Sequence, residues 1–183
     1  MNSINRYYLP ADQWSSLALT GDEAHHCVRV LRQKLGDEIV VFDGRGSSVQ
    51  CQIVSADKNQ VVLKQDGEVE VQSRGLSLHL CQAVPKAGNM ELIVQKAVEL
   101  GVASIQPLIT ENTVVKADEK KLQKWQRIAL EACKQCGQDW LPEVKPVLGF
   151  TDWVASREKS ELEIVAALDP RSQQMAQELR AHG

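Results

Sequence analysis

A change of hydrophobic period near residues 72–75 is the feature of this sequence that most constrains its fold. Before it, apolar and polar residues alternate in short runs, as in half-buried β-strands. After it, apolar runs alternate with segments of helical period, which is typical of a parallel α/β sheet. The sequence therefore predicts a small β-barrel over residues 1–72 and an α/β domain over residues 73–183.

Four strands and one helix are predicted in the first domain. The strands cover residues 6–9, 38–42, 49–54 and 60–64. Residues 43–46, with two glycines, predict a hairpin turn between the second and third strands. Thr20 and Glu23 have the spacing of a capping box, which predicts a helix that continues through Leu31.

Strands and helices alternate in the second domain. Strands are predicted at residues 76–81, 104–109 and 162–168, and helices at residues 89–100, 118–136 and 172–181. Thr151 is expected to cap a further short helix, and Gly101 and Gly137 to end two helices in the left-handed conformation. Pro107 lacks a backbone N–H, so we expect an edge strand or a strand end there. Three parallel strands are few for an open sheet, which indicates that this domain is incomplete.

Composition excludes several classes of protein. Lys and Arg number 21 against 24 Asp and Glu, so a net charge of −3 argues against nucleic-acid binding by bulk charge alone. No segment has the apolar length of a membrane span, and the N-terminal residues lack the pattern of a secretory signal. Five cysteines are typical of reduced thiols. We therefore expect a cytoplasmic protein.

Motifs for metal binding and for common catalytic chemistry are missing from the sequence. Cys133 and Cys136 form a lone CxxC within a predicted helix, without the second pair of a zinc site. His25 and His26 diverge by about 100° on a helix, so they are poorly placed to share one ion. The nucleophile elbow, the phosphate loop and the dinucleotide fingerprint are also absent. We therefore expect no metal site.

Two groups of cations are candidate contacts for a phosphate backbone. Arg29, Arg32 and Lys34 lie at the end of the first domain's helix and just beyond it. Lys124 and Arg127 belong to a cationic stripe, completed by Lys120 and Lys134, along the helix predicted at residues 118–136. A solvated helix face gives the same spacing, so the stripe alone does not indicate nucleic-acid binding.

Five motifs occur in a fixed order along the chain. They are H-x-x-R-V-L-R at residues 26–32, F-D-G at 42–44, Q-x-x-x-K-x-x-x-M-E at 82–91, Q-K-x-x-E-L-G-V at 95–102 and E-A-x-x-Q-x-G at 131–137. Each motif alone is weakly specific, but together and in register they are specific. The whole chain resembles the family of bacterial ribosomal RNA small-subunit methyltransferase E.

The resemblance implies a PUA-like RNA-binding barrel followed by a SPOUT methyltransferase domain. That domain is a trefoil-knotted α/β fold that works as a homodimer. The implied reaction transfers a methyl group from S-adenosylmethionine to N3 of a uridine in 16S ribosomal RNA. Lys86 and Lys96, which stand in matched motifs, join the candidate RNA contacts.

The sequence departs from the family at its C-terminal end. The family's G-P-E-G-G loop and the following L-G-x-R-I-L-R stretch, which carry most of the S-adenosylmethionine site, are absent. Only the leading edge of that site, with Leu168, Pro170 and Arg171, is expected here. Asn112 and Gln138 replace arginines that are common in the family. The chain is therefore either a fragment or a defective member, and we expect it to bind S-adenosylmethionine poorly.

The catalytic residues and two alternative functions stay open. Glu99 and Glu131 are candidate bases for the N3 proton, although a helix carboxylate is more often a surface or capping group. One alternative is a catalytically inactive module that binds ribosomal RNA. The other is an unrelated α/β metabolic enzyme with a pocket at its strand ends.

Overall fold

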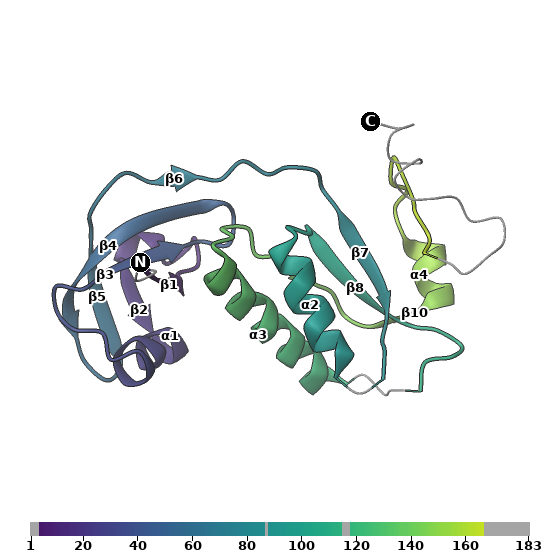
Figure 1. Ribbon diagram of the computed structural model, residues 1–183, viewed down its shortest axis with the longest axis horizontal. Coiled ribbons are helices and arrows are strands. Elements are labelled where there is room, and N and C mark those ends of the chain that lie inside the picture. The colour runs from purple at the N-terminus through teal and green to yellow at the C-terminus, as the bar shows by residue number, and fades with distance from the viewer. Residues whose placement is uncertain (1–3, 87, 115–117, 167–183) are drawn as a thin grey trace. The chain divides into compact units, whose positions relative to one another are not determined.

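The computed structural model describes residues 4–86, 88–114 and 118–166 of the chain (Figure 1). Contacts divide the chain into one compact unit over residues 1–150 and a second over residues 151–183. No helix in the described part of the chain is both long enough and apolar enough to cross a bilayer.

The N-terminal half of the first unit, residues 4–72, is built on a six-stranded sheet. Its strands are β1 (Asn5–Tyr8), β2 (Ala18–Thr20), β3 (Glu38–Phe42), β4 (Ser47–Ala56), β5 (Gln60–Gln65) and β6 (Glu70–Val71). The order is β1-β3-β4-β5-β2, with β6 paired to β4, and only β1 and β3 pair in parallel. The four predicted strands are confirmed. The sequence missed β2 and β6, which are too short to show an alternating pattern.

One apolar cluster fills the N-terminal half. Its fully buried members include Tyr7, Leu9, Leu19, Ile39, Val41, Val49, Ile53 and Val61. Residues of β4 alternate between buried and exposed positions, because successive side chains of a strand point to opposite faces. This packing makes the N-terminal half a firm support for the loops at its rim.

The helix predicted from Thr20 through Leu31 is two elements in the structure. A short 3₁₀ helix, η1 (Trp14–Ser16), comes before them; α1 (Gly21–His25) is then followed by one π-helical turn, η2 (His26–Val30). The capping-box prediction is wrong, because the Thr20 side chain makes no capping hydrogen bond. Glu23 is engaged elsewhere: its carboxylate accepts from the backbone N–H of Tyr8 at 3.2 Å and pairs with a distant lysine.

The α/β half of the first unit, residues 73–150, has a parallel sheet with two helices on one face (Figure 1). Its elements are β7 (His79–Ala83), α2 (Asn89–Glu99), β8 (Ser104–Ile109), α3 (Glu119–Cys136), β9 (Glu143–Val144) and β10 (Leu148–Gly149). Val94, Val98, Ile105, Trp125 and Ala129 are central to its core.

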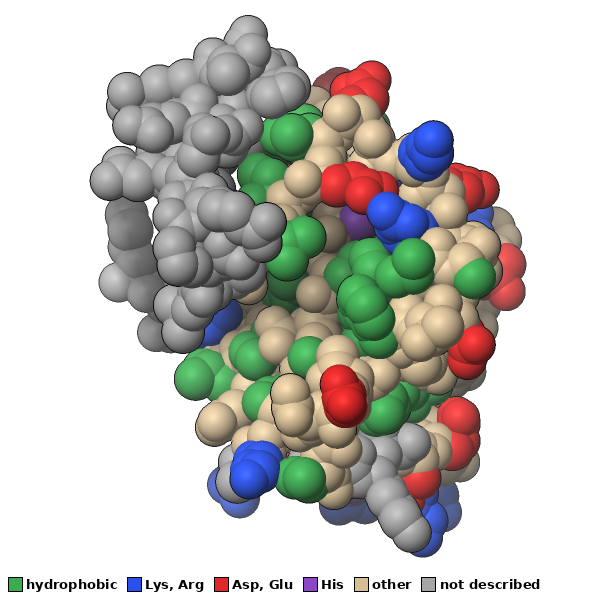
Figure 2. Space-filling model, turned by 90° about the vertical axis from the view of Figure 1, so that its right-hand side faces the viewer, with side chains coloured by type: hydrophobic (Ala, Val, Ile, Leu, Met, Phe, Trp, Pro, Cys, Tyr) green, Lys and Arg blue, Asp and Glu red, His purple; other side chains and the backbone are tan. Residues whose placement is uncertain are grey.

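The strand predicted at residues 76–81 begins later than expected and is not buried. β7 starts at His79, and Leu76 and Leu78 before it are exposed. Among the described strands β7 pairs only with β8, so its other edge forms no strand pairing there. Figure 2 shows hydrophobic side chains on the face of the molecule that it views.

The prediction that Pro107 marks an edge strand or a strand end is wrong. β8 is central, with β7 on one side and β9 and β10 on the other. The backbone nitrogen of Pro107 points to the same edge of β8 as the carbonyl of Ile105, which accepts a hydrogen bond from Lys145 N at 2.9 Å. The neighbouring strand is interrupted there, and Gln106 Nε2 donates to the Pro146 carbonyl at 2.7 Å. The missing N–H of Pro107 thus coincides with a break in the ladder.

The predicted ends of α2 and α3 are confirmed. The Asp118 side chain accepts from Lys121 N at 3.0 Å and caps α3. Gly137 ends α3 with φ of 79°, and Gly101 follows α2 with φ of 78°. Both glycines occupy the left-handed region, where a side chain is strained.

The predictions for the second unit are largely not met within the described residues. α4 (Phe150–Ser156) begins before Thr151, so Thr151 lies inside the helix and does not cap it. Residues 162–166 form no strand, because no described strand offers them a hydrogen-bonding partner. Residues 167 and 168 of that predicted strand, and the helix predicted at 172–181, lie outside the described residues.

Candidate functional site

The segment from Arg29 to Leu35, which we call the exit segment, presents cations that have no charged partner. The side chains of Arg29, Arg32 and Lys34 are exposed, and among the described residues none of them forms an ion pair. A phosphate can bind such a cation without first breaking an existing ion pair. The structure thus brings together the three residues that the sequence placed here.

The backbone of the exit segment is unusual and firmly held. It leaves the π-helical turn η2, and Arg32 has φ of 53°, a left-handed conformation rarely adopted by residues other than glycine. Gln33 N donates to the Cys27 carbonyl at 3.0 Å, and Lys34 N donates to the Asp37 carboxylate at 2.8 Å. A hydrogen bond from Gly36 N to the Ile53 carbonyl ties its end to β4. The cations therefore project from a fixed loop.

Most cations of α2 and α3 are already paired. Lys96 Nζ lies 2.7 Å from a Glu99 carboxylate oxygen, and Lys124 pairs with Glu91 across the two helices. Arg127 is exposed, and no side-chain bond to it is found among the described residues. Of the predicted stripe on α3, Lys124 and Lys134 are therefore paired, whereas Lys120 and Arg127 are exposed and form no ion pair among the described residues. Lys86, between β7 and α2, is exposed like Arg127.

Lys134, the last member of the predicted stripe, is not a surface cation. Its side chain is only 7% exposed, and Nζ lies 2.6 Å from Glu23 and 2.9 Å from Glu131. Burial lowers the pKa of Lys134, but the hydrogen bonds to Glu23 and Glu131 outweigh burial and leave the pKa above its ordinary value. Lys134 thus joins α3 to α1 and is structural.

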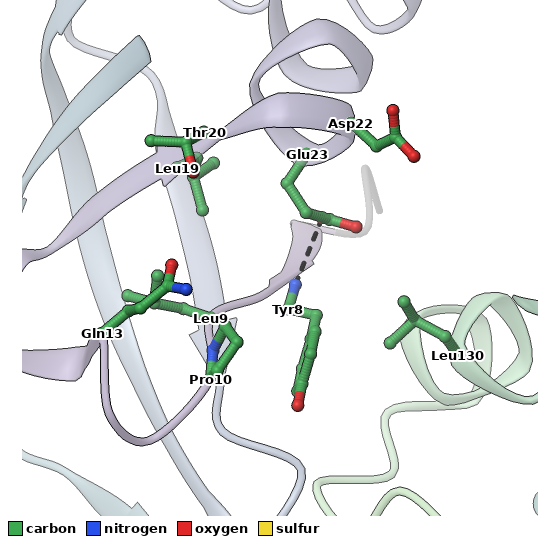
Figure 3. A pocket seen from close by; sticks show the side chains of 9 residues that line it. All are labelled: Tyr8, Leu9, Pro10, Gln13, Leu19, Thr20, Asp22, Glu23 and Leu130. Carbon is green, nitrogen blue, oxygen red and sulfur yellow. Dashed lines mark hydrogen bonds between the residues drawn. The ribbon is translucent and has the colours of Figure 1, made fainter. Parts of the chain in front are cut away.

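A cavity of about 260 Å³ lies beside this ion pair (Figure 3). Its walls include Leu9, Leu19 and Leu130, and Asp22 and Glu23 stand on its α1 side. In Figure 3 the Glu23 carboxylate turns toward the backbone nitrogen of Tyr8, to which the dashed line runs. Asp22 beside the cavity repels phosphate, and the Glu23 carboxylate is already paired with Lys134, so we do not assign RNA-backbone binding to the cavity.

Asp139, which the sequence did not single out, connects the two halves of the first unit. It is buried and forms an ion pair with Arg6 of β1, and its second carboxylate oxygen accepts from Ser48 Oγ at 2.9 Å. Asp139 N donates to Gln72 Oε1 at 3.0 Å, and Gly46 N donates to the Asp139 carbonyl at 3.0 Å. Asp139 therefore joins β1, β4 and Gln72, which lies at the boundary between the two halves of the first unit.

Trp140 continues the joint at the hairpin turn between β3 and β4. Its indole N–H donates to the Gln72 carbonyl at 2.9 Å, and the Arg74 guanidinium lies 4.7 Å from the ring centroid. A Cβ atom on Gly46 would lie 2.5 Å from the Trp140 ring. The predicted turn is confirmed, and its second glycine, Gly46, was the signal for this close approach.

The carboxyl ends of three parallel strands lie side by side in the α/β half. Ala83 of β7 and Leu148 of β10 both pair with Leu108 of β8. Ligands of open α/β sheets bind at such ends. Among the described residues Thr110 and Thr113 supply hydroxyls there, with their Oγ1 atoms 3.0 Å apart.

The predicted cofactor residues Leu168, Pro170 and Arg171 lie outside the described residues. Among the described residues the hydroxyls of Thr110 and Thr113 are bonded to each other, so they offer a polar ligand only their remaining hydrogen-bonding capacity.

Neither candidate base has the surroundings of a general base. The Glu99 side chain accepts from Lys96 and Gln95, and these hydrogen bonds lower its pKa below the ordinary value for a carboxyl group. Glu131 is engaged with Lys134. A lowered pKa makes Glu99 a weak proton acceptor, and Glu131 is already bonded to Lys134, so we assign neither residue to catalysis.

The cysteines and histidines form no ligand cluster within the described residues. Cys133 is fully buried, and burial raises the pKa of its thiol to about 12. Cys136, one helical turn on, is exposed, and its thiol lies against the Cys133 carbonyl at 3.9 Å. The CxxC pair therefore packs as part of α3.

Family models match both halves of the chain. One described as "RNA methyltransferase PUA domain" matches residues 19–66, and one described as "RNA methyltransferase domain" matches residues 72–182. The ribosomal RNA small subunit methyltransferase E of Synechocystis is 35% identical over 140 residues, which cover 76% of this chain and 46% of that protein. The Bacillus subtilis protein of the same name is 30% identical over 157 residues, with coverages of 80% and 61%. The chain thus spans about half to three-fifths of these curated relatives.

Solved structures resemble the chain closely. A putative methyltransferase from Legionella pneumophila, in complex with S-adenosylmethionine, has a TM-score of 0.77 and 32% identity over 85% of this chain and 67% of that one. The ribosomal RNA small subunit methyltransferase E of Neisseria gonorrhoeae, also bound to S-adenosylmethionine, has a TM-score of 0.70 and 29% identity with the same coverages. The fold and the family predicted from the motifs are confirmed. The chain belongs to the ribosomal RNA small subunit methyltransferase E family, with a PUA-like N-terminal half and a SPOUT-type methyltransferase fold in its α/β half.

Proposed function

We propose that this chain serves the S-adenosylmethionine-dependent methylation of N3 of a uridine in 16S ribosomal RNA, as a homodimer in the cytoplasm. The observation that carries the proposal is the match of both halves to RNA methyltransferase domains. The unpaired cations of the exit segment support it from the structure, because they suit an RNA backbone.

RNA is held first by the N-terminal half. Arg29, Arg32 and Lys34 bind phosphates, with Lys86 and Arg127 as additional contacts on the α/β half. Lys96 and Lys124 contribute less, because a phosphate must compete with Glu99 and Glu91 for them. The affinity therefore depends mainly on the exit segment.

The strand ends of the α/β half are the place for the cofactor, and Leu168, Pro170 and Arg171 are its predicted contacts. When bound there, S-adenosylmethionine supplies an electrophilic methyl group on a sulfonium. The N3 proton of uridine must leave or be shared as the new bond forms. Because Glu99 and Glu131 are both engaged, positioning and the local electrostatics carry more of the acceleration than a dedicated base does.

The contacts of Asp139 and Trp140 offer a way to position the RNA relative to the strand ends. They fix the half that holds RNA to the half that carries the strand ends through a buried ion pair and four hydrogen bonds. A fixed separation brings a uridine to the strand ends once its neighbours are held by the exit segment.

The test compares the 183-residue chain with the same chain extended by the C-terminal residues of the Bacillus subtilis relative that lie beyond the match. Each protein is incubated with 16S ribosomal RNA and S-adenosylmethionine, and nuclease digests are analysed by mass spectrometry for 3-methyluridine. We expect both proteins to bind the RNA and the extended one to form 3-methyluridine. Binding without any methylated uridine would favour an RNA-binding module, and no salt-dependent binding would favour a metabolic enzyme.

A further inference from the structure

The exit segment exposes aliphatic side chains between its cations. Val30 is 58% exposed, Leu31 is 40% exposed and Leu35 is 65% exposed. They alternate with Arg29, Arg32 and Lys34 along the chain, and none of the three belongs to the core of the N-terminal half. Phosphate binding explains the cations, but it does not explain three neighbouring aliphatic groups in water.

The backbone holds these groups outward at a cost. A left-handed conformation is strained at a residue such as Arg32 and persists only where the surroundings enforce it. The π-helical turn before it widens the helix at Val30, and such turns are frequent at functional sites. Because the loop is fixed at Gln33, Lys34 and Gly36, Leu31 has little freedom to fold back onto the core.

We propose that Val30, Leu31 and Leu35 form a wedge that packs against unpaired bases of the RNA whose phosphates bind Arg29, Arg32 and Lys34. The proposal rests on the proposed function and adds to it the kind of RNA that is recognised. Unpaired bases offer a flat, weakly polar face beside a charged backbone, which is the pattern that the exit segment complements.

Charge favours RNA over a protein or a lipid surface as the partner. The nearby carboxylates are used inside the protein: Asp37 accepts from Lys34 N, and Glu38 accepts from Gln50 Nε2 at 3.1 Å. The exit segment itself carries three cations and no carboxylate. A partner must bring several negative charges and apolar surface within a few ångströms, and an RNA strand with unstacked bases does so in every nucleotide.

The wedge should make binding depend on unpaired bases. In a fully paired stem the bases are stacked and covered, so only the phosphate contacts remain available. A stem with unpaired bases adds contact between the bases and the aliphatic side chains of Val30, Leu31 and Leu35.

The test uses the full chain and two hairpin RNAs, one with three unpaired bases in its stem and one with a fully paired stem. The variant carries Val30→Ser and Leu31→Ser, and the matched control is Val54→Ser, at an aliphatic residue of β4 that is 47% exposed. We expect the double variant to bind the bulged hairpin about tenfold more weakly, and the paired hairpin within about twofold of the unchanged protein. The control should bind both as the unchanged protein does.

The salt dependence separates this proposal from the proposed function. The double variant should keep the salt slope of the unchanged protein, because its phosphate contacts remain. Equal weakening on both hairpins, or no weakening on the bulged one, would overturn the wedge. Loss of binding to anionic phospholipid vesicles, with RNA binding intact, would assign the segment to a membrane surface instead. If the unchanged protein shows no salt-dependent binding to 16S ribosomal RNA, the proposed function itself fails.

Discussion

The exposed cations of the exit segment and those of α2 and α3 differ in what surrounds them. Lys96 and Lys124 each lie against a glutamate, one on the same helix and one across the helix pair. Arg29 lies in the π-helical turn η2 and Arg32 follows it, and no acidic residue of the described chain pairs with either side chain. Side chains three and four residues apart share one face of a helix, which lets Lys96 pair with Glu99.

This difference shows that the spacing of cations along a sequence does not reveal their availability. A regular stripe on α3 looked as promising as the cluster in the exit segment, yet Lys134 is buried and Lys124 is paired. Availability depends on which carboxylates the fold places beside each cation. Four experiments test how far this contrast between paired and free cations extends.

The largest expected effect is on stability, at the most buried of the paired cations. Lys134→Met leaves the carboxylate of Glu23 without its cation in a site that is mostly closed to water. We expect the free energy of unfolding to fall by about 3 kcal/mol or more, measured by urea denaturation. Lys96→Met, at an exposed pair, should change it by less than about 0.5 kcal/mol. Equal losses in the two variants would contradict the structural role of Lys134.

The next effect is on RNA binding and contrasts free cations with paired ones. Arg29→Gln with Arg32→Gln should weaken binding to 16S ribosomal RNA about tenfold or more and lower the salt slope by about 0.7 to 0.9 for each lost phosphate contact. Lys96→Gln with Lys124→Gln is the matched pair of changes on α2 and α3, and the slope should stay nearly constant there. If the two double variants behave alike in filter binding, the distinction between free and paired cations is wrong.

A smaller effect on stability is expected at Gly101, where α2 ends. Gly101 has φ of 78°, and a Cβ atom there would lie 3.4 Å from Gln138 Nε2. Gly101→Val should reduce stability by more than about 1 kcal/mol, seen as a lower melting temperature. Gly75→Val is the control, since Gly75 has no positive φ and a Cβ atom there meets nothing within 4 Å. Equal melting temperatures for the two variants would remove this assignment.

The smallest expected effect is on the pH dependence of stability, and it compares one buried thiol from each of the two apolar cores. Burial raises the pKa of Cys51 to about 11 and of Cys133 to about 12, above the ordinary value of 9.0. Each thiol therefore adds stability that is fully present below pH 9 and is lost as the pH rises toward the folded-state value. Replacing Cys133 with alanine should reduce the loss of stability between pH 8 and pH 9.5 by about 1 kcal/mol. An unchanged pH dependence in calorimetry would show that this thiol ionises equally well in the folded protein.

Features set by local residues could be predicted from the sequence. The hairpin from β3 to β4 follows from alternating residues and a glycine turn, and α3 from its cap at Asp118 and its end at Gly137. The exit segment was found because its cations lie close together in the chain. In each case the deciding contacts are between near neighbours in sequence.

Features set by distant residues could not be predicted. The predicted capping box does not form, and Glu23 pairs instead with Lys134, far along the chain. The place where β7 begins depends on its register with β8. Pro107 lies in a central strand because the neighbouring strand breaks beside it. Asp139 gave no signal at all, since its partners are spread over the N-terminal half.

The bond between Arg6 and Asp139 has a consequence for how the protein is made. Its two residues are 133 positions apart, so the loop that it closes contains most of the first unit. During synthesis β1 leaves the ribosome early, but Asp139, the ion-pair partner of its Arg6, follows only after α3. Contacts of such long range form late and slow the overall rate of folding. We therefore expect the N-terminal sheet to acquire its final stability only when the residues after α3 have left the ribosome.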